Sequence, residues 1–285
     1  MNYQHAFHAG NFADVHKHIV LTRVLEYLRQ KPAPFRVVDT HAGAGRYDLL
    51  EQQAARSGEW RDGIERLFAA PRSGAAGTDS AQALVAPYLD IVAALNPGGT
   101  LRLYPGSPLI VKALLRRQDR LIACELEPSA AASLKAALHG DARVKALAID
   151  GWKALFANIP PKERRGLIVI DPPYEESVEF ARLRDTLAQA HRKWANGLYL
   201  LWYPIKAREA PDALARQLRR LSVPKILRCE LTITPPCADG ALAGSGLIIV
   251  NPPFPLEREL RVILPALTRL LAPMGAYRLD WLSGE

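Results

Sequence analysis

Apolar residues follow two alternating patterns along most of the chain. Unbroken apolar runs are typical of strands that are buried on both faces of a parallel sheet. Residues 167–170 form such a run, and we predict further strands over residues 35–39, 120–124, 144–149, 197–203, 225–234 and 246–250, which are rich in apolar residues. Between them, apolar residues recur every three or four positions, which predicts helices over residues 12–30, 108–117, 128–139, 177–191 and 211–221.

The alternation of strands and helices predicts an α/β fold built on a seven-stranded, mostly parallel sheet. Its last two strands are expected to form an antiparallel pair at the edge. Residues 51–105 interrupt the rhythm, because they are rich in alanine, glycine and serine. We therefore expect residues 1–50 and 106–285 to form the main domain and residues 51–105 to form a small helical insertion. The insertion either packs on the main domain or binds a substrate, and the sequence does not distinguish between these two roles.

Composition and charge narrow the class of protein. The chain of 285 residues has a net charge of +8 and a pI of about 9.5, which is compatible with a polyanionic partner. Basic residues cluster in the stretches 116–120, 162–165 and 216–228. No apolar run is long enough to cross a bilayer, and the N-terminus lacks a signal-peptide segment. We therefore expect a cytoplasmic protein with no membrane partner.

A glycine-rich turn follows the first predicted strand. The strand ends at Asp39, and residues 41–46 read His-Ala-Gly-Ala-Gly-Arg. Glycines let the backbone approach a ligand closely and adopt dihedral angles that other residues resist. In nicotinamide-binding folds the acidic residue comes about 20 residues after the glycines, so Asp39 disfavours a nicotinamide oxidoreductase. The order D-x-x-x-G-x-G resembles the first motif of S-adenosylmethionine-dependent methyltransferases.

Acidic residues also follow the next three predicted strands, at Glu125, Asp150 and Asp171. The carboxyl ends of parallel strands meet at one edge of the sheet, which is where ligands bind in open α/β folds. A carboxylate at Glu125 can accept hydrogen bonds from a ribose diol, and one at Asp150 can accept from an adenine amino group. These acids, together with Asp39, predict a site for an adenosine-containing cofactor. Ser107 is expected to cap the helix that follows it.

The last of these acids begins the sequence Asp171-Pro172-Pro173-Tyr174. The prolines cannot donate ladder hydrogen bonds, so the strand must end there. The exocyclic amine of adenine is a weak nucleophile, because its lone pair is delocalised into the ring. The Asp171 carboxylate and the Pro172 carbonyl can accept hydrogen bonds from that amine and help to localise the lone pair. The ring of Tyr174 can stack on the base.

A second motif of this kind, Asn251-Pro252-Pro253-Phe254, follows the seventh predicted strand. An asparagine can replace the aspartate in sites that methylate an amine. The order of the strands places this motif away from the expected crevice, so we favour Asp171.

Histidines near the N-terminus raise the question of a metal site. His16 and His18 lie two positions apart on a predicted helix, so they cannot face the same ion. Lys17 lies between them and opposes a cation. The cysteines Cys124, Cys229 and Cys237 are scattered and have no metal-binding spacing. We predict no metal.

Three blocks of the chain resemble the RlmJ family of bacterial 23S ribosomal RNA adenine-N6 methyltransferases. They are Tyr3-x-His5-x-Phe7-His8-Ala9-Gly10-Asn11-x-Ala13-Asp14-Val15-x-Lys17-His18, Asp39-Thr40-His41-Ala42-Gly43-Ala44-Gly45-Arg46-Tyr47 and Asp171-Pro172-Pro173-Tyr174. The resemblance covers essentially the whole chain and implies a Rossmann-like class I methyltransferase fold. It also implies S-adenosyl-L-methionine as the cofactor and 23S ribosomal RNA, free of ribosomal proteins, as the substrate.

The resemblance assigns roles to individual residues. The positions that match the family's contacts to S-adenosylmethionine are His18, His41, Ser107, Glu125, Asp150, Gly151 and Asp171. Asp171 falls on the catalytic position, Tyr3 on a tyrosine implicated in holding the RNA, and Lys17 near the site. We therefore expect methylation of adenine N6 in 23S ribosomal RNA, with Asp171, Pro172 and Tyr174 at the reacting base. Two alternatives stay open: a DNA adenine-N6 methyltransferase, and a non-catalytic RNA-binding protein with the same fold.

Overall fold

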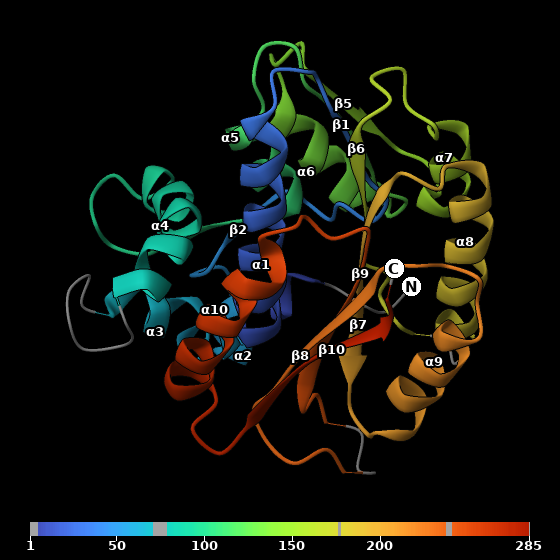
Figure 1. Ribbon diagram of the computed structural model, residues 1–285. Coiled ribbons are helices and arrows are strands. Elements are labelled where there is room, and N and C mark those ends of the chain that lie inside the picture. The colour runs from blue at the N-terminus through green and yellow to red at the C-terminus, as the bar shows by residue number, and fades with distance from the viewer. Residues whose placement is uncertain (1–4, 71–78, 176–177, 238–240, 285) are drawn as a thin grey trace.

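A mixed eight-stranded sheet forms the centre of the computed structural model, which describes residues 5–70, 79–175, 178–237 and 241–284 (Figure 1). The strands lie in the order β10-β8-β9-β7-β6-β1-β4-β5. Their bounds are β1 Arg36–Asp39, β4 Arg120–Cys124, β5 Val144–Leu147, β6 Gly166–Ile170, β7 Leu198–Ile205, β8 Ile226–Thr232, β9 Gly244–Val250 and β10 Ala276–Ser283. Strands β5, β4, β1, β6 and β7 are parallel, whereas β9 is antiparallel to both of its neighbours.

The sheet has eight strands, one more than the seven expected from the sequence. The additional strand is β10, which pairs with β8 and forms the edge. The antiparallel pairing of β8 with β9 is confirmed, but its expected position at the edge is wrong. The residues of β10 are mostly exposed or half-buried. An edge strand with water on one side carries no unbroken apolar run, so the pattern that predicts the buried strands does not reveal it.

Helices cover both faces of the sheet, as an α/β fold requires. On one face, at the right of Figure 1, lie α7 Gly151–Ala157, α8 Glu179–Lys193 and α9 Glu209–Arg219. On the other lie α1 Phe12–Gln30, α5 Ser107–Leu114, α6 Pro128–Leu138 and α10 Leu256–Leu271. Successive side chains of a strand point to opposite faces. Leu167 and Val169 of β6 therefore join the core with α1, and Ile168 and Ile170 join the core with α8.

Helix α1 lies largely in the interior and follows the short 3₁₀ helix η1 His5–Phe7. It begins at Asn11, whose side chain accepts hydrogen bonds from the backbone N–H groups of the first turn. This start directs Asp14, Lys17 and His18 into the protein, where all three are buried. Buried polar side chains cost free energy unless they are paired, so each of them needs a partner.

Residues 51–105 leave and rejoin the sheet through a small antiparallel pair, β2 Arg46–Asp48 and β3 Leu103–Pro105. The stretch contains α2 Gln52–Ser57, η2 Glu59–Arg61, α3 Ile64–Ala69 and α4 Asp79–Ala94. Helix α4 contacts α1 and α10, on the left of Figure 1. Tyr88 of α4 and Tyr104 of β3 are fully buried in the same core as α1. The stretch therefore packs on the face of the sheet that carries α1.

Candidate active site

A cavity of about 920 Å³ lies where the parallel strands β1, β4, β5 and β6 end. Its wall includes all of the residues expected to contact the cofactor: His18, His41, Ser107, Glu125, Asp150, Gly151 and Asp171. Lys17 also lines it. The fold thus gathers residues that are widely separated in sequence around one space of the size that nucleotide-sized ligands occupy.

The turn after β1 forms one side of the cavity and depends on glycine. Gly43 and Gly45 have φ angles of 59° and 79°, in the left-handed region. The Glu125 carboxylate accepts a hydrogen bond from the N–H of Gly43 at 2.9 Å. It also accepts from the N–H groups of Leu126 and Glu127, each at 2.8 Å. Glu125 therefore fixes the glycine turn from the end of β4.

Asp150 and Gly151 form the next wall at the start of α7. Asp150 caps this helix, since its Oδ1 accepts from the N–H of Trp152 at 2.8 Å. Its Oδ2 lies 3.7 Å from the guanidinium of Arg182, which lies 4.6 Å over the Trp152 ring. Gly151 has no room for a side chain, because a Cβ would lie 1.7 Å from the carbonyl oxygen of Thr40. The start of α7 can approach the end of β1 only with glycine at this position.

Asp39, at the end of β1, is fully buried beside the cavity. The Ser107 hydroxyl donates to Asp39 Oδ2 at 2.7 Å, while Oδ1 has no hydrogen-bond partner among the described residues. Burial raises the pKa of Asp39 to about 7, because desolvation disfavours the charged form. Ser107 is the first residue of α5, and Gly106 occupies the N-cap position. The expected capping role of Ser107 is therefore wrong; its hydroxyl binds Asp39 instead.

His18 reaches the cavity wall from α1 and is tied to the inserted stretch. Its Nδ1 lies 2.8 Å from the Tyr104 hydroxyl, which lies 2.9 Å from the Tyr88 hydroxyl. Within the part of the chain that the structure describes, Nε2 of His18 has no partner. Burial lowers the pKa of His18 to about 3, so the ring is neutral. Sequence reasoning missed both tyrosines, since they lie far along the chain from His18 and belong to no motif.

His41 lies in the turn after β1. Its Nδ1 is 2.8 Å from the Thr40 hydroxyl, and its ring meets Trp152 edge-on with the centroids 5.0 Å apart. Burial lowers the pKa of His41 to about 3. A neutral imidazole held in this way keeps one ring nitrogen for a ligand.

Asp171 follows β6 and is held by a buried lysine. Lys17 donates to Asp171 Oδ2 at 2.5 Å and to Asp14 Oδ1 at 2.9 Å. Asp14 Oδ2 lies 3.1 Å from Nε2 of His5. Burial lowers the pKa of Lys17, but the two carboxylates outweigh burial and raise that pKa above its ordinary value. Lys17 is therefore a permanent cation that fixes one oxygen of Asp171. The i, i+3 spacing of Asp14 and Lys17 is a sequence signal for their pairing.

Pro173 also lines the cavity, whereas Pro172 and Tyr174 are not part of its wall. Pro172 is buried. Tyr174 has a φ of 53°, and its hydroxyl donates to the carbonyl oxygen of Trp202 at 2.7 Å. Its ring packs against Phe180 and Trp202. The stacking of Tyr174 on a base stays a prediction, and Tyr3 lies outside the described residues.

The histidines have separate partners. His16 bonds to Ser245 at 3.0 Å and to Cys229 at 3.2 Å, on the other side of α1 from Tyr104. Across residues 5–70, 79–175, 178–237 and 241–284, no group of three or more His, Cys, Asp or Glu side chains is arranged to hold a metal ion. None of the described helices is both long and apolar enough to span a membrane.

A doubly covered parallel sheet, a glycine turn after its first strand and acids after the next strands define a class I methyltransferase. The sequence model of the family described as "Ribosomal RNA large subunit methyltransferase D, RlmJ" matches residues 32–283. The chain belongs to this family, which confirms the resemblance seen in the sequence.

Individual relatives are similar to this chain over nearly its full length. The chain is 40% identical over 275 residues to "Ribosomal RNA large subunit methyltransferase J" of Escherichia coli strain K12, with 96% of this chain and 95% of that protein covered. It is 38% identical over 288 residues to the protein of the same name in Haemophilus influenzae, with 100% of both covered. A crystal structure from Legionella pneumophila str. Philadelphia 1 has a TM-score of 0.88 and 36% identity, with 98% of this chain and 99% of that one covered.

Proposed function

We propose that the chain transfers a methyl group from S-adenosylmethionine to N6 of an adenine in 23S ribosomal RNA that is free of ribosomal proteins. The observation that carries the proposal is the position of Asp171. Its carboxylate lies on the wall of the same cavity as the glycine turn and the acids Glu125 and Asp150. The names of the two full-length relatives support ribosomal RNA as the substrate.

The cavity fits an adenosine cofactor that carries a positive charge. Its wall contains eight carboxylates but three Lys and Arg side chains, which favours a cation. Two buried polar atoms beside it, His18 Nε2 and Asp39 Oδ1, have no partner among the described residues. Such atoms are stabilised when a ligand supplies the missing hydrogen bond. The residues that would hold the cofactor are His18, His41, Ser107, Glu125, Asp150 and Gly151.

When bound, S-adenosylmethionine supplies an electrophilic methyl group on a positively charged sulfur. The protein's task is then to position the target amine and to hold its lone pair ready. Asp171 Oδ2 is held by Lys17, and Oδ1, which has no hydrogen-bond partner among the described residues, can accept a hydrogen bond from the amine. The Pro172 carbonyl would accept from the other N–H, and Tyr174 would pack on the base. Because the amine becomes more acidic as it is alkylated, no general base of high pKa is required.

The target base must leave its stack to reach Asp171. An adenine inside a helix cannot present its amine to a cavity at the end of a strand. The proposal therefore requires an unpaired or extruded adenine. It also requires that Lys17 stay bound to Asp171 while the base enters, since the lysine is buried and its two ion pairs are with Asp14 and the half-buried Asp171.

The proposal is tested by incubating the chain with S-adenosylmethionine and either protein-free 23S ribosomal RNA or DNA of the same sequence. Mass spectrometry of the digested product should find N6-methyladenine in the RNA alone. Asp171→Ala should bind the cofactor in calorimetry but transfer no methyl group. Methylation of the DNA would support the DNA-modifying alternative. Cofactor binding by the unaltered chain without transfer to any RNA would support a non-catalytic role.

A further inference from the structure

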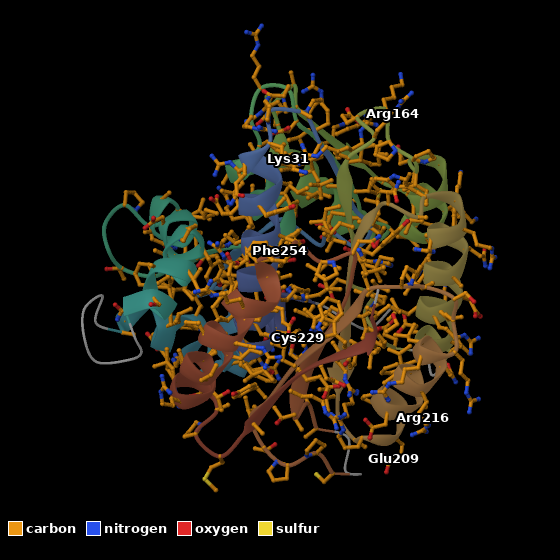
Figure 2. All side chains as sticks on the ribbon, viewed as in Figure 1. Lys31, Arg164, Glu209, Arg216, Cys229 and Phe254 are labelled. Carbon is orange, nitrogen blue, oxygen red and sulfur yellow. The ribbon has the colours of Figure 1, made fainter. Side chains whose placement is uncertain are left out.

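Basic residues gather at the end of the sheet opposite the cavity, where the parallel strands β1, β4 and β6 begin. Three loops meet there: residues 31–36, 115–120 and 161–165. They contain eight basic and two acidic residues, a net charge of +6 compared with +8 for the whole chain. Figure 2 shows Lys31 and Arg164 at this end of the molecule. We call these three loops the basic edge.

Part of this charge supports the fold. Arg116 and Arg165 donate to backbone carbonyl oxygens in and after the last turn of α1, which carry partial negative charge. Arg120 donates to carbonyl oxygens of its own loop. Arg36 pairs with Glu163 at 2.9 Å. All four of these arginines therefore make hydrogen bonds or an ion pair within the protein.

The remaining four basic residues have no such role: Lys31, Arg117, Lys162 and Arg164. All four are exposed, and no described acid pairs with any of them. The loop holds Arg164 at a φ of 56°, a region that non-glycine residues rarely adopt. Unpaired cations on neighbouring loops repel one another, a cost that a bound polyanion removes.

The third basic stretch of the sequence, residues 216–228, behaves differently. Arg228 pairs with Asp280 at 2.8 Å, and Arg219 lies 3.4 Å from the same carboxylate. Arg228 also lies within 3.8 Å of Glu230. Acids thus pair with two basic residues of that stretch, Arg219 and Arg228, whereas no described acid pairs with the four exposed cations of the basic edge.

We propose that Lys31, Arg117, Lys162 and Arg164 form a second contact site for the phosphate backbone of the substrate RNA. The inference rests on the proposed function, because it takes its RNA partner from it. The cavity receives one base, and its excess of carboxylates repels phosphates. The charge that holds the backbone must therefore lie elsewhere, and Lys and Arg side chains bind phosphates as point charges and as forked donors.

The two sites lie within reach of one RNA. Strands β1, β4 and β6, which run between the two edges, have four or five residues each. At about 3.3 Å per residue they span roughly 15 Å, to which the loops add at both ends. A folded RNA segment of a few helical turns can pass from the basic edge to the cavity mouth around the side of the sheet.

The test compares two variants that lose the same charge. The first is Lys31→Gln, Arg117→Gln, Lys162→Gln and Arg164→Gln together. The control is Arg216→Gln, Arg220→Gln, Arg258→Gln and Arg269→Gln, which are exposed and have no acidic partner among the described residues. Filter binding to protein-free 23S ribosomal RNA is measured between 50 and 200 mM salt, and thermal unfolding verifies that both variants are folded.

The first variant should raise the Kd at least about tenfold and reduce the slope of log Kd against log salt by about three, since each phosphate contact contributes about 0.7 to 0.9. The control should change neither quantity by a comparable amount. Equal losses in both variants, or no loss in the first, would overturn the proposal. Binding is measured without methyl transfer, so an unaltered chain that binds through this edge but methylates no RNA would overturn the proposed function alone.

Discussion

Two Pro-Pro motifs follow strands of the same sheet, but they lie at opposite ends of those strands. Asp171-Pro172-Pro173-Tyr174 follows β6, which is parallel to its neighbours β1 and β7. Asn251-Pro252-Pro253-Phe254 follows β9, which is antiparallel to β7, so that Val250 pairs with Tyr199 near the start of β7. The direction of β9, together with its place in the sheet beyond β7, keeps the second motif away from the cavity.

The two motifs also differ in what their first residues contact. Asp171 is bound by Lys17 on the cavity wall. Asn251 donates its amide to the carbonyl oxygens of Ala195 and Gly197 at 2.8 and 2.7 Å, which joins two loops. Phe254 is 97% exposed. Under the proposed function, similar sequences serve chemistry at one end of the strands and the stability of the fold at the other, and substitutions should separate the two roles.

The largest difference is expected at the first residue of each motif. Asp171→Asn keeps the shape but weakens the acceptor, so kcat for methyl transfer should fall on the order of 10³-fold. The free energy of unfolding should change little, because Lys17 can still pair with Asp14. Single-turnover transfer at saturating cofactor and RNA measures the first quantity, and urea unfolding the second. A kcat within a few fold of the unaltered chain would remove Asp171 from the chemistry.

Lys17→Met should affect both activity and stability. It leaves the carboxylates of Asp14 and Asp171 without their common partner, which should cost about 3 kcal/mol of stability. Adding Asp14→Asn removes one of the two stranded charges and should restore part of the loss. Urea unfolding of the single and double variants tests this, and equal stability of the two would contradict the cluster as described.

The raised pKa of Asp39 makes the free energy of unfolding of the chain depend on pH. The folded chain keeps the Asp39 proton up to about pH 7, whereas the unfolded chain releases it near the ordinary value of 3.8. Between these values the unfolded chain binds fewer protons, so stability falls as pH rises. Asp39→Asn removes this term. Its stability relative to the unaltered chain should therefore increase from pH 4 to pH 8, and a constant difference across that range would refute the raised pKa.

Asn251→Ala should destabilise the fold without touching the chemistry. Two backbone carbonyl groups lose their donor, which should cost about 2 kcal/mol. Methyl transfer below the unfolding transition should be unchanged, since Asn251 lies at the edge opposite the cavity. A loss of kcat in a chain that is still folded would show that the two motifs are not separate.

The smallest expected effect concerns the link from the inserted stretch to the cavity. Tyr104→Phe removes the hydroxyl between His18 and Tyr88, so the preferred tautomer of His18 is no longer fixed. Cofactor affinity should fall about fivefold, or about 1 kcal/mol. Nitrogen NMR shifts of His18 in the free protein should change with it. Unaltered shifts and affinity would show that the tyrosines only fill the core.

The buried strands, the glycine turn and the strand-end acids could be predicted from sequence, because each leaves a local pattern. Asp171, Glu125 and Asp150 follow apolar runs directly, and their meeting at one edge follows from parallel pairing. Strand β10 could not be predicted, since it is half-exposed and carries no apolar run. The contact of Tyr104 with His18 could not either, because it depends on how residues 51–105 pack on α1. The division into a domain and an insertion stays a prediction.

The most direct test is to map N6-methyladenine in 23S ribosomal RNA from cells that lack the gene and are supplied with the unaltered chain, Asp171→Asn or Asn251→Ala. The unaltered chain and Asn251→Ala should restore the same methylated adenine, and Asp171→Asn should restore none. A mark restored in full by Asp171→Asn, or no mark restored by the unaltered chain, would contradict the assignment of this carboxylate to adenine methylation.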